Sequence, residues 1–232
     1  MFNPQPTDYD VSFRFLGFPI RIHPFFWVIA AILGMQGEIG DMKTWLIDLT
    51  VWIAAVFVAI MVHELGHGLA FRYVFGVRSM IVLHGAGGVT VPFVRHQRQR
   101  GFLGFLSEVF LSAAGVLAGF LLVLLIYVFF LLLGPNTFLG KGALGVFFFQ
   151  LGFVCIVWGV LNLLPIYPLD GGHISREVFC LISPRTGEAN SLALSLVVAV
   201  LIAVLWIRVG AFYNAALFAY LAYLSWQTLA RR

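Results

Sequence analysis

Two histidines and a glutamate lie close together in residues 61–71, MVHELGHGLAF, near the end of a long apolar run. His63, Glu64 and His67 fit the pattern His-Glu-x-x-His, and positions four apart share one face of a helix. The two imidazoles can therefore bind one metal ion, with Glu64 beside it as a base that takes a proton from water. Hydrogen bonding between helices is the alternative role for the histidines. A metal site is favoured because ionisable groups within a membrane span are costly and usually functional.

Two histidines alone are an incomplete site, because a catalytic zinc needs three protein ligands and an open position for water. The acidic candidates in or beside the predicted spans are Glu64 itself, Glu108 and Asp170. Asp170 lies in the segment NLLPIYPLDGGH, residues 162–173, whose prolines end the preceding helix. An ordinary Asp-Gly turn is the alternative interpretation. A ligand role is favoured because irregular backbone at the membrane edge is tolerated only where it lines a cavity or is buried in protein.

The composition indicates a membrane protein. Of the 232 residues, 61% are hydrophobic and only 10% are charged, and the mean hydropathy is +0.99. Soluble domains carry about 25% charged residues, so a soluble globular protein is excluded. Long apolar runs without alternation favour helices over a barrel. The spans use nearly the whole chain, so we expect a single domain over residues 1–232.

The predicted fold class is an all-α polytopic membrane protein with about six transmembrane helices and a small membrane-associated β-hairpin or sheet. Residues 1–22 contain alternating apolar positions and predict N-terminal strands. Residues 78–94 are rich in β-branched types and are interrupted by glycines, which predicts a hairpin. The six predicted spans cover residues 24–35, 45–70, 103–133, 145–164, 189–207 and 210–228.

The distribution of basic residues predicts the orientation. With the N-terminus inside, eleven of the fourteen basic residues fall inside, and only Lys43, Lys141 and Arg208 fall outside. Positive residues are enriched on the cytoplasmic side, so both termini are predicted to be cytoplasmic. The ends of the second and fourth spans then share that side. The basic loop at 95–100 is expected to contact anionic headgroups of the lipid bilayer, and no nucleic acid partner is predicted.

These motifs resemble those of the site-2 protease family of intramembrane zinc metalloproteases. The resemblance rests on HELGH in the second span and on NLLPIYPLDGGH after the fourth. It extends to GFPIRIHP (17–24), similar to the family's N-terminal strand, and to HGAGGVT (84–90), similar to its membrane hairpin. The resemblance implies one Zn²⁺ per chain. Its ligands would be His63, His67 and Asp170, with Glu64 as the general base and a substrate-facing role for Asn162.

One segment departs from the family pattern. Many relatives carry Ala-Gly-Pro-x-x-Asn after a glutamate in the third span. Here Ala114 and Gly115 are present, but Val116 and Gly119 replace the proline and the asparagine. This departure concerns packing or substrate handling near the third span, not the metal site.

The predicted function is that of a zinc metalloendopeptidase that cleaves a transmembrane segment of a single-span membrane protein, as in regulated intramembrane proteolysis. A helical substrate must unwind to be cut, and the hairpin offers an edge onto which it could add as a strand. Gly87 and Gly88 would allow its backbone to approach closely. We expect a plasma (inner) membrane location, an active site facing the cytoplasm and a regulatory membrane partner. The alternatives are a non-catalytic membrane client-binding protein and, ranked lowest, a metal transporter.

Overall fold

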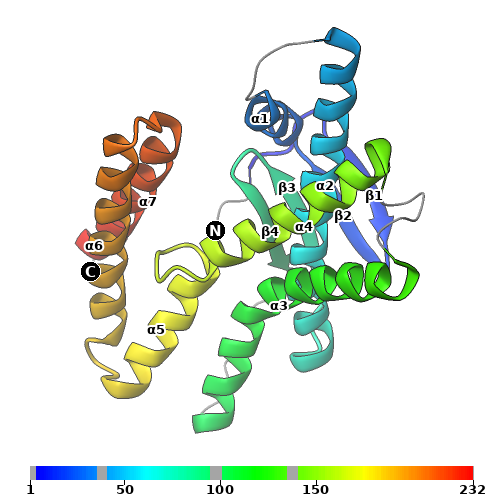
Figure 1. Ribbon diagram of the computed structural model, residues 1–232. Helices are drawn as coiled ribbons and strands as arrows, with labels where there is room; N and C mark the ends of the chain where they lie inside the picture. The colour runs from blue at the N-terminus through cyan, green and yellow to red at the C-terminus, as the bar shows by residue number, and fades with distance from the viewer. Residues whose placement is uncertain (1–3, 36–40, 95–100, 135–140, 232) are drawn as a thin grey trace. The chain divides into compact units, whose positions relative to one another are not determined.

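The computed structural model describes residues 4–35, 41–94, 101–134 and 141–231. The predicted basic loop at 95–100 lies outside the described residues. Along the described chain (Figure 1) the elements are β1 (Val11–Phe15), β2 (Phe18–Ile22), α1 (Pro24–Gly34), α2 (Met42–Val74), β3 (Ser79–His84), β4 (Gly87–Pro92), α3 (Gly101–Leu133), α4 (Gly142–Asn162), α5 (Asp170–Ile182), α6 (Gly187–Arg208) and α7 (Phe212–Ala230).

The chain forms two compact units. Unit 1 comprises Met1–Gln97 and Ala114–Gly159, and unit 2 comprises Arg98–Ala113 and Val160–Arg232. Helices α3 and α4 therefore contribute residues to both units. The assignment of the whole chain to a single functional domain stays a prediction.

A four-stranded sheet in the order β1-β2-β3-β4 belongs to unit 1. The β1–β2 and β3–β4 pairs are antiparallel, whereas β2 and β3 are parallel, with Ile20 opposite Ile81. The turn between β1 and β2 contains Leu16 at φ 49° and Gly17 at φ 81°. Such two-residue turns need positive φ at both positions, which glycine adopts easily. The strands predicted within residues 1–22 and the hairpin predicted at 78–94 are confirmed.

The sheet packs on α2 through an apolar core. Phe18, Ile20 and Ile81 are almost fully buried together with Ala55 and Ile60 of α2. Small residues along this part of α2 let the sheet approach the helix closely, and dense apolar packing is what stabilises such an interface. The position of the sheet is therefore tied to the helix that carries His63 and His67.

A polar cluster is also buried by the sheet. Arg21 forms an ion pair of 3.2 Å with Asp10, and its guanidinium also donates to the carbonyl of Pro4 at 2.8 Å. In β3, the Nδ1 atom of His84 accepts from the amide of Ala86 at 3.2 Å. Burial, followed by Coulombic interactions with His23 and Arg21, lowers the pKa of His84 below its ordinary value. His84 is thus held in its neutral form.

Unit 2 is built around helices α5, α6 and α7. Helices α6 and α7 lie side by side (Figure 1) and make extensive contacts. Their core contains Ile166, which precedes α5, together with Ala199, Phe218 and Ala222. The loop that leads to Asp170 is therefore packed into this core.

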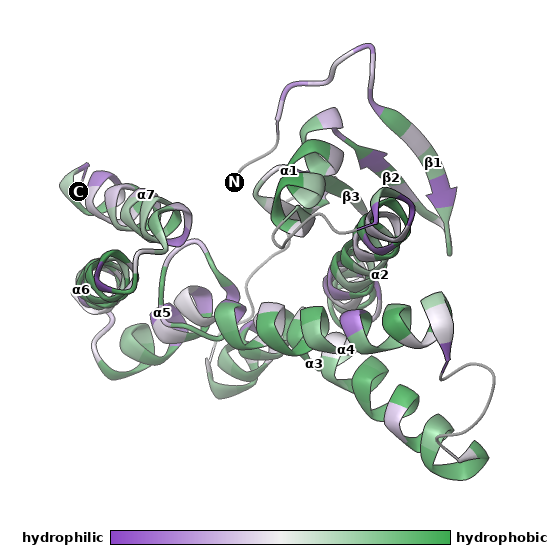
Figure 2. Ribbon diagram, turned by 45° about the horizontal axis from the view of Figure 1, so that its top comes forward, coloured by the Kyte–Doolittle hydropathy of each residue, from purple (hydrophilic) through white to green (hydrophobic). Residues whose placement is uncertain are grey.

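Four helices of the described chain are long and apolar enough to cross a membrane: α2, α3, α4 and α6. Figure 2 shows α3 and α4 as largely hydrophobic along their length, whereas α5 carries polar residues. Helix α1 has 11 residues, about 16 Å in length, against a hydrocarbon core of about 30 Å. Helix α7 has 19 residues but is not among the apolar set. The mainly helical architecture with a small sheet is confirmed, whereas the count of about six spans is not.

Candidate metal centre

His63 and His67 lie on one face of α2, as their spacing of four predicts. His63 is only 4% exposed, and the Nε2 atoms of the two rings are 3.2 Å apart. The rings meet edge to face, with centroids 4.9 Å apart. The two nitrogens that could act as metal ligands therefore converge on the same point.

This spacing suits a zinc ion. Two nitrogens that each lie about 2.0–2.1 Å from zinc in tetrahedral geometry are about 3.3 Å apart. The observed separation of 3.2 Å is close to that value, without any rotation of either ring. Imidazole nitrogen is also a preferred zinc donor. The histidine pair thus fits two of the ligands of a tetrahedral zinc site.

Helix α3 leaves open the space in front of the two nitrogens. A Cβ atom at Gly115 would lie 2.7 Å from Nε2 of His63 and would also collide with Nε2 of His67. On the facing helix, a Cβ at Gly66 would strike the carbonyl oxygen of Ala114. The two glycines therefore allow α2 and α3 to pack closely while keeping the ligand nitrogens uncovered.

Glu64 is buried beside the histidines and is held by strand β4. Its exposure is 4%, and that of Thr90 is 6%. The Thr90 hydroxyl lies 2.8 Å from the carboxylate oxygen Oε2 of Glu64 and 2.9 Å from the main-chain carbonyl of the same residue. A Cβ at Gly88 would come within 2.6 Å of Oε1. The carboxylate is thus confined by two residues of one strand.

Asp170 belongs to unit 2, where it is the first residue of α5. The alternative interpretation as a turn residue is wrong, because residues 170–182 form a continuous helix. An acidic residue in a first helical turn is favoured by the helix dipole. Gly171 follows it, and a Cβ there would collide with the carbonyl of Leu163. Glycine at this position lets the start of α5 pack directly on the preceding loop.

Two fully buried serines anchor the loop before Asp170. The hydroxyl of Ser195 in α6 accepts from the amide of Tyr167 at 3.1 Å and lies 3.0 Å from the carbonyl of Pro165. The hydroxyl of Ser225 in α7 lies 3.4 Å from the carbonyl of Tyr167. Irregular backbone inside an apolar core needs such partners. The serines therefore define where α5 begins and where Asp170 is placed within unit 2.

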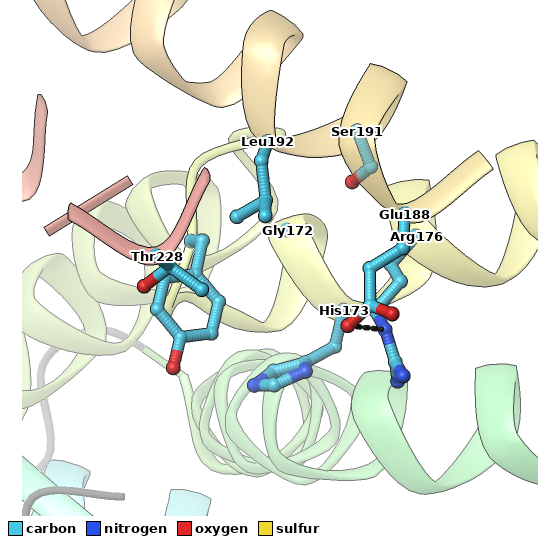
Figure 3. Close-up of a pocket in the computed structure, with 8 residues that line it drawn as sticks. Gly172, His173, Arg176, Glu188, Ser191, Leu192 and Thr228 are labelled. Atoms are coloured by element: carbon cyan, nitrogen blue, oxygen red, sulfur yellow. Dashed lines mark hydrogen bonds and ion pairs between the residues drawn. The ribbon is translucent and has the colours of Figure 1, made fainter. Parts of the chain in front are cut away.

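A cavity of ≈ 120 Å³ lies next to the first turn of α5, within unit 2. Figure 3 shows His173 and Arg176 from α5 along it, together with Thr228 from α7. Arg176 is paired with Glu188 of α6, with 3.1 Å between Nε and the carboxylate. His173 therefore lines a cavity next to the helical turn that Asp170 begins.

The three residues predicted to bind substrate each have a described place. Asn162 ends α4 and is 8% exposed. A Cβ at Gly87 would lie 2.5 Å from the indole of Trp158, and Gly88 faces Glu64 as described above. Close packing thus explains why both positions are glycine, and their role in substrate binding stays a prediction.

His63 and His67 of unit 1 and Asp170 of unit 2 together offer a donor set of two imidazoles and one carboxylate. This donor set is one that catalytic zinc sites use. Neither the contact of Thr90 with Glu64 nor the contact of Gly115 with the ligand nitrogens is predicted from the sequence. The contact of Thr90 had one signal in the sequence. Thr90 is a polar residue two positions after Gly88 and therefore lies on the same face of the strand.

Comparisons with known proteins agree with this chemistry. The family model described as Peptidase family M50 matches residues 136–206, which include Asp170 and the loop before it. A curated zinc metalloprotease of Methanocaldococcus jannaschii is 25% identical over 170 residues, covering 72% of this chain and 44% of that protein. The chain thus spans less than half the length of this curated relative.

The fold has a counterpart among solved structures. The site-2 protease from Methanocaldococcus jannaschii matches with a TM-score of 0.61 at 20% sequence identity, covering 95% of each chain. At this identity the likeness shows a shared fold. Together with the family-model match and the curated relative, it supports the resemblance of this chain to the site-2 protease family.

Proposed function

We propose that this protein is an intramembrane zinc-dependent endopeptidase that cleaves a transmembrane segment of a membrane protein substrate. The observation that carries the proposal is the histidine pair with nitrogens 3.2 Å apart, next to a buried glutamate. A metal site with a purely structural role needs no base beside it. The retained Glu64 therefore favours hydrolysis over a non-catalytic client-binding function.

In this proposal His63, His67 and Asp170 hold one zinc ion per chain. Zinc, when bound, would supply Lewis-acid activation of water and of the scissile carbonyl. Glu64 takes the proton from the attacking water and passes it to the nitrogen of the leaving amine. The amide of Asn162 donates to the substrate backbone, as amide groups do at an oxyanion.

The substrate in this proposal is a single-span membrane protein whose helix has locally unwound. Every carbonyl of an intact helix is engaged in hydrogen bonds, so the chain must open before it is cut. β4 is the last strand in the sheet order β1-β2-β3-β4. An extended substrate segment could pair with its outer edge as a further strand. Gly87 and Gly88 have no side chains that would keep the substrate backbone away.

The four apolar helices indicate an integral membrane protein. We further propose a plasma (inner) membrane location with the termini and the centre facing the cytoplasm, supported by the asymmetry of basic residues. The same proposal includes additional spans over 24–35 and 210–228. It also includes a role in regulated intramembrane proteolysis and a regulatory membrane partner.

The test begins with purified protein in detergent. Zinc content is measured for the wild type and for Asp170→Ala, and cleavage is assayed for the wild type and Glu64→Gln. The probes are a labelled single-span protein and a labelled unfolded chain, which needs no unwinding. We expect Glu64→Gln to keep zinc and lose cleavage, and Asp170→Ala to lose zinc.

Glu108→Gln is the matched control, because it removes an acid from α3, outside the proposed centre. Full cleavage by Glu64→Gln would overturn the base assignment, and wild-type zinc content in Asp170→Ala would overturn the third ligand. Binding of the single-span protein without cleavage by the wild type would instead favour the client-binding alternative. Comparative membrane proteomics of cells with wild-type protein or Glu64→Gln then identifies natural substrates.

A further inference from the structure

Strand β4 contacts the proposed catalytic base through two residues. The Thr90 hydroxyl is 2.8 Å from Oε2 of Glu64, and Gly88 lies against the rest of the carboxylate. Residues two apart on a strand face the same side, so Gly88 and Thr90 form one continuous surface under Glu64. Val89 and Val91 face the other side.

We propose that Thr90 is a positioning residue for catalysis, and that with Gly88 it holds the Glu64 carboxylate in its reactive orientation. This inference rests on the proposed function of Glu64 as general base. Thr90 acts through Glu64 and needs no contact with substrate or metal. The strand offered as the substrate-binding edge is then the same strand that orients the base.

The residue types suit this role. A glutamate side chain has three rotatable bonds, and an unrestrained carboxylate would sample many orientations. A hydroxyl that donates to an ionised carboxylate makes a charge-assisted hydrogen bond, which is stronger than a neutral one. Threonine is β-branched, so its own side-chain rotamer on a strand is restricted. The hydroxyl is therefore itself held in place.

Gly88 supplies the complementary constraint. A Cβ there would lie 2.6 Å from Oε1 and 2.7 Å from Cδ of Glu64. The carboxylate therefore packs against the backbone of β4 at Gly88, with Oε2 toward Thr90. Register also places Gly88 opposite Leu83 and Thr90 opposite Ile81, both fully buried in β3. The surface under Glu64 thus belongs to a well-packed part of the sheet.

The experiment compares three variants of the full chain: Thr90→Val, which removes the hydroxyl at nearly constant shape, Thr90→Ser, which keeps it, and the control Thr50→Val. Thr50 lies on an exposed part of α2, where its hydroxyl donates to the carbonyl of Leu46 at 2.7 Å. The labelled unfolded chain is the cleavage probe. Zinc content and melting temperature are measured on every sample.

We expect Thr90→Val to lower kcat about 10- to 100-fold, part of the 10²–10⁴-fold that a positioned base contributes. KM and zinc content should stay near wild type, and the melting temperature should fall only as far as the loss of one buried hydrogen-bonding hydroxyl explains. Thr90→Ser should recover most of the lost kcat, and Thr50→Val should change nothing. Unchanged kcat in Thr90→Val would overturn the inference. A loss of zinc, or unfolding at the assay temperature, that accounts for the loss of activity would do the same, since Thr90 would then be merely structural.

A second readout does not depend on cleavage. The infrared difference spectrum between wild type and Glu64→Gln isolates the carboxylate stretching band of Glu64. Thr90→Val should shift this band, and Thr50→Val should leave it in place; an unshifted band in Thr90→Val overturns the inference. If Glu64→Gln cleaves like wild type, the proposed function fails. If Glu64→Gln is inactive while Thr90→Val is fully active, only the present inference fails.

Discussion

Gly115→Ala should weaken zinc binding without lowering the stability of the protein. In α3, the added Cβ would lie 2.7 Å from Nε2 of His63 and would collide with Nε2 of His67. These are two of the three protein ligand atoms of the proposed zinc ion. The methyl group would therefore occupy the space through which the ion is reached.

The size of the effect follows from two opposing terms. Alanine favours a helix interior over glycine by about 1 kcal/mol, so α3 itself should become more stable. Changes next to metal ligands commonly lower metal affinity about 10- to 100-fold. Because this atom would touch the ligand nitrogens themselves, we expect the upper end of that range. A 100-fold loss corresponds to about 2.8 kcal/mol of binding free energy.

The assay is a zinc competition titration with a chromophoric chelator on purified protein, run beside thermal unfolding. Gly119→Ala is the matched control on the same helix, since the nearest atoms to its Cβ would be 3.9 and 4.0 Å away. Both variants should unfold at or above the wild-type temperature in the absence of zinc, and only Gly115→Ala should lose affinity. Wild-type zinc affinity in Gly115→Ala, or an equal loss in both variants, would refute the reasoning.

Three further predictions concern stability and the site around Asp170. Ser195→Ala should destabilise the protein by about 1–3 kcal/mol, because the buried amide of Tyr167 loses its acceptor; denaturant unfolding measures this. The pKa of His84 is lowered in the folded state. The unfolded chain therefore binds more protons, and stability should fall as the pH drops below about 6.5. His84→Asn should weaken that fall when melting temperatures at pH 7.5 and 5.5 are compared. Gly171→Ala should reduce zinc content because its Cβ meets backbone, whereas Gly152→Ala, with no atom within 4 Å, should not.

The histidine geometry was predictable because it depends only on the helical repeat. Once residues 45–70 were expected to be helical, a spacing of four placed His63 and His67 on one face. The helix that starts at Asp170 was not predicted. Its first residues, Asp-Gly-Gly, have poor helix propensity, and the packing of Gly171 on the preceding loop is a tertiary contact that local sequence does not reveal.

The contacts of Glu64 with β4 could not be predicted for a similar reason. The hairpin itself was evident from its β-branched residues and glycines. Which face of the hairpin meets α2 depends on the parallel pairing of β2 with β3, where Ile20 lies opposite Ile81. Such long-range pairing leaves no local signal. The sequence suggests substrate contacts for these glycines, which stay a prediction, and the structure shows in addition that the Glu64 side chain and Trp158 lie against them.

The order of the strands also has a consequence for how the protein is made. Glu64 and its hydroxyl partner Thr90 are 26 residues apart, and β2 can pair with β3 only after both intervening helices have been synthesised. Because β4 follows α2 in the chain, α2 leaves the ribosome before the strand that receives its carboxylate. Its strongly apolar stretch, with a mean hydropathy of 2.3, must carry His63 and Glu64 through insertion unaided. The contact between Glu64 and Thr90 can form only once β4 has followed α2 out of the ribosome.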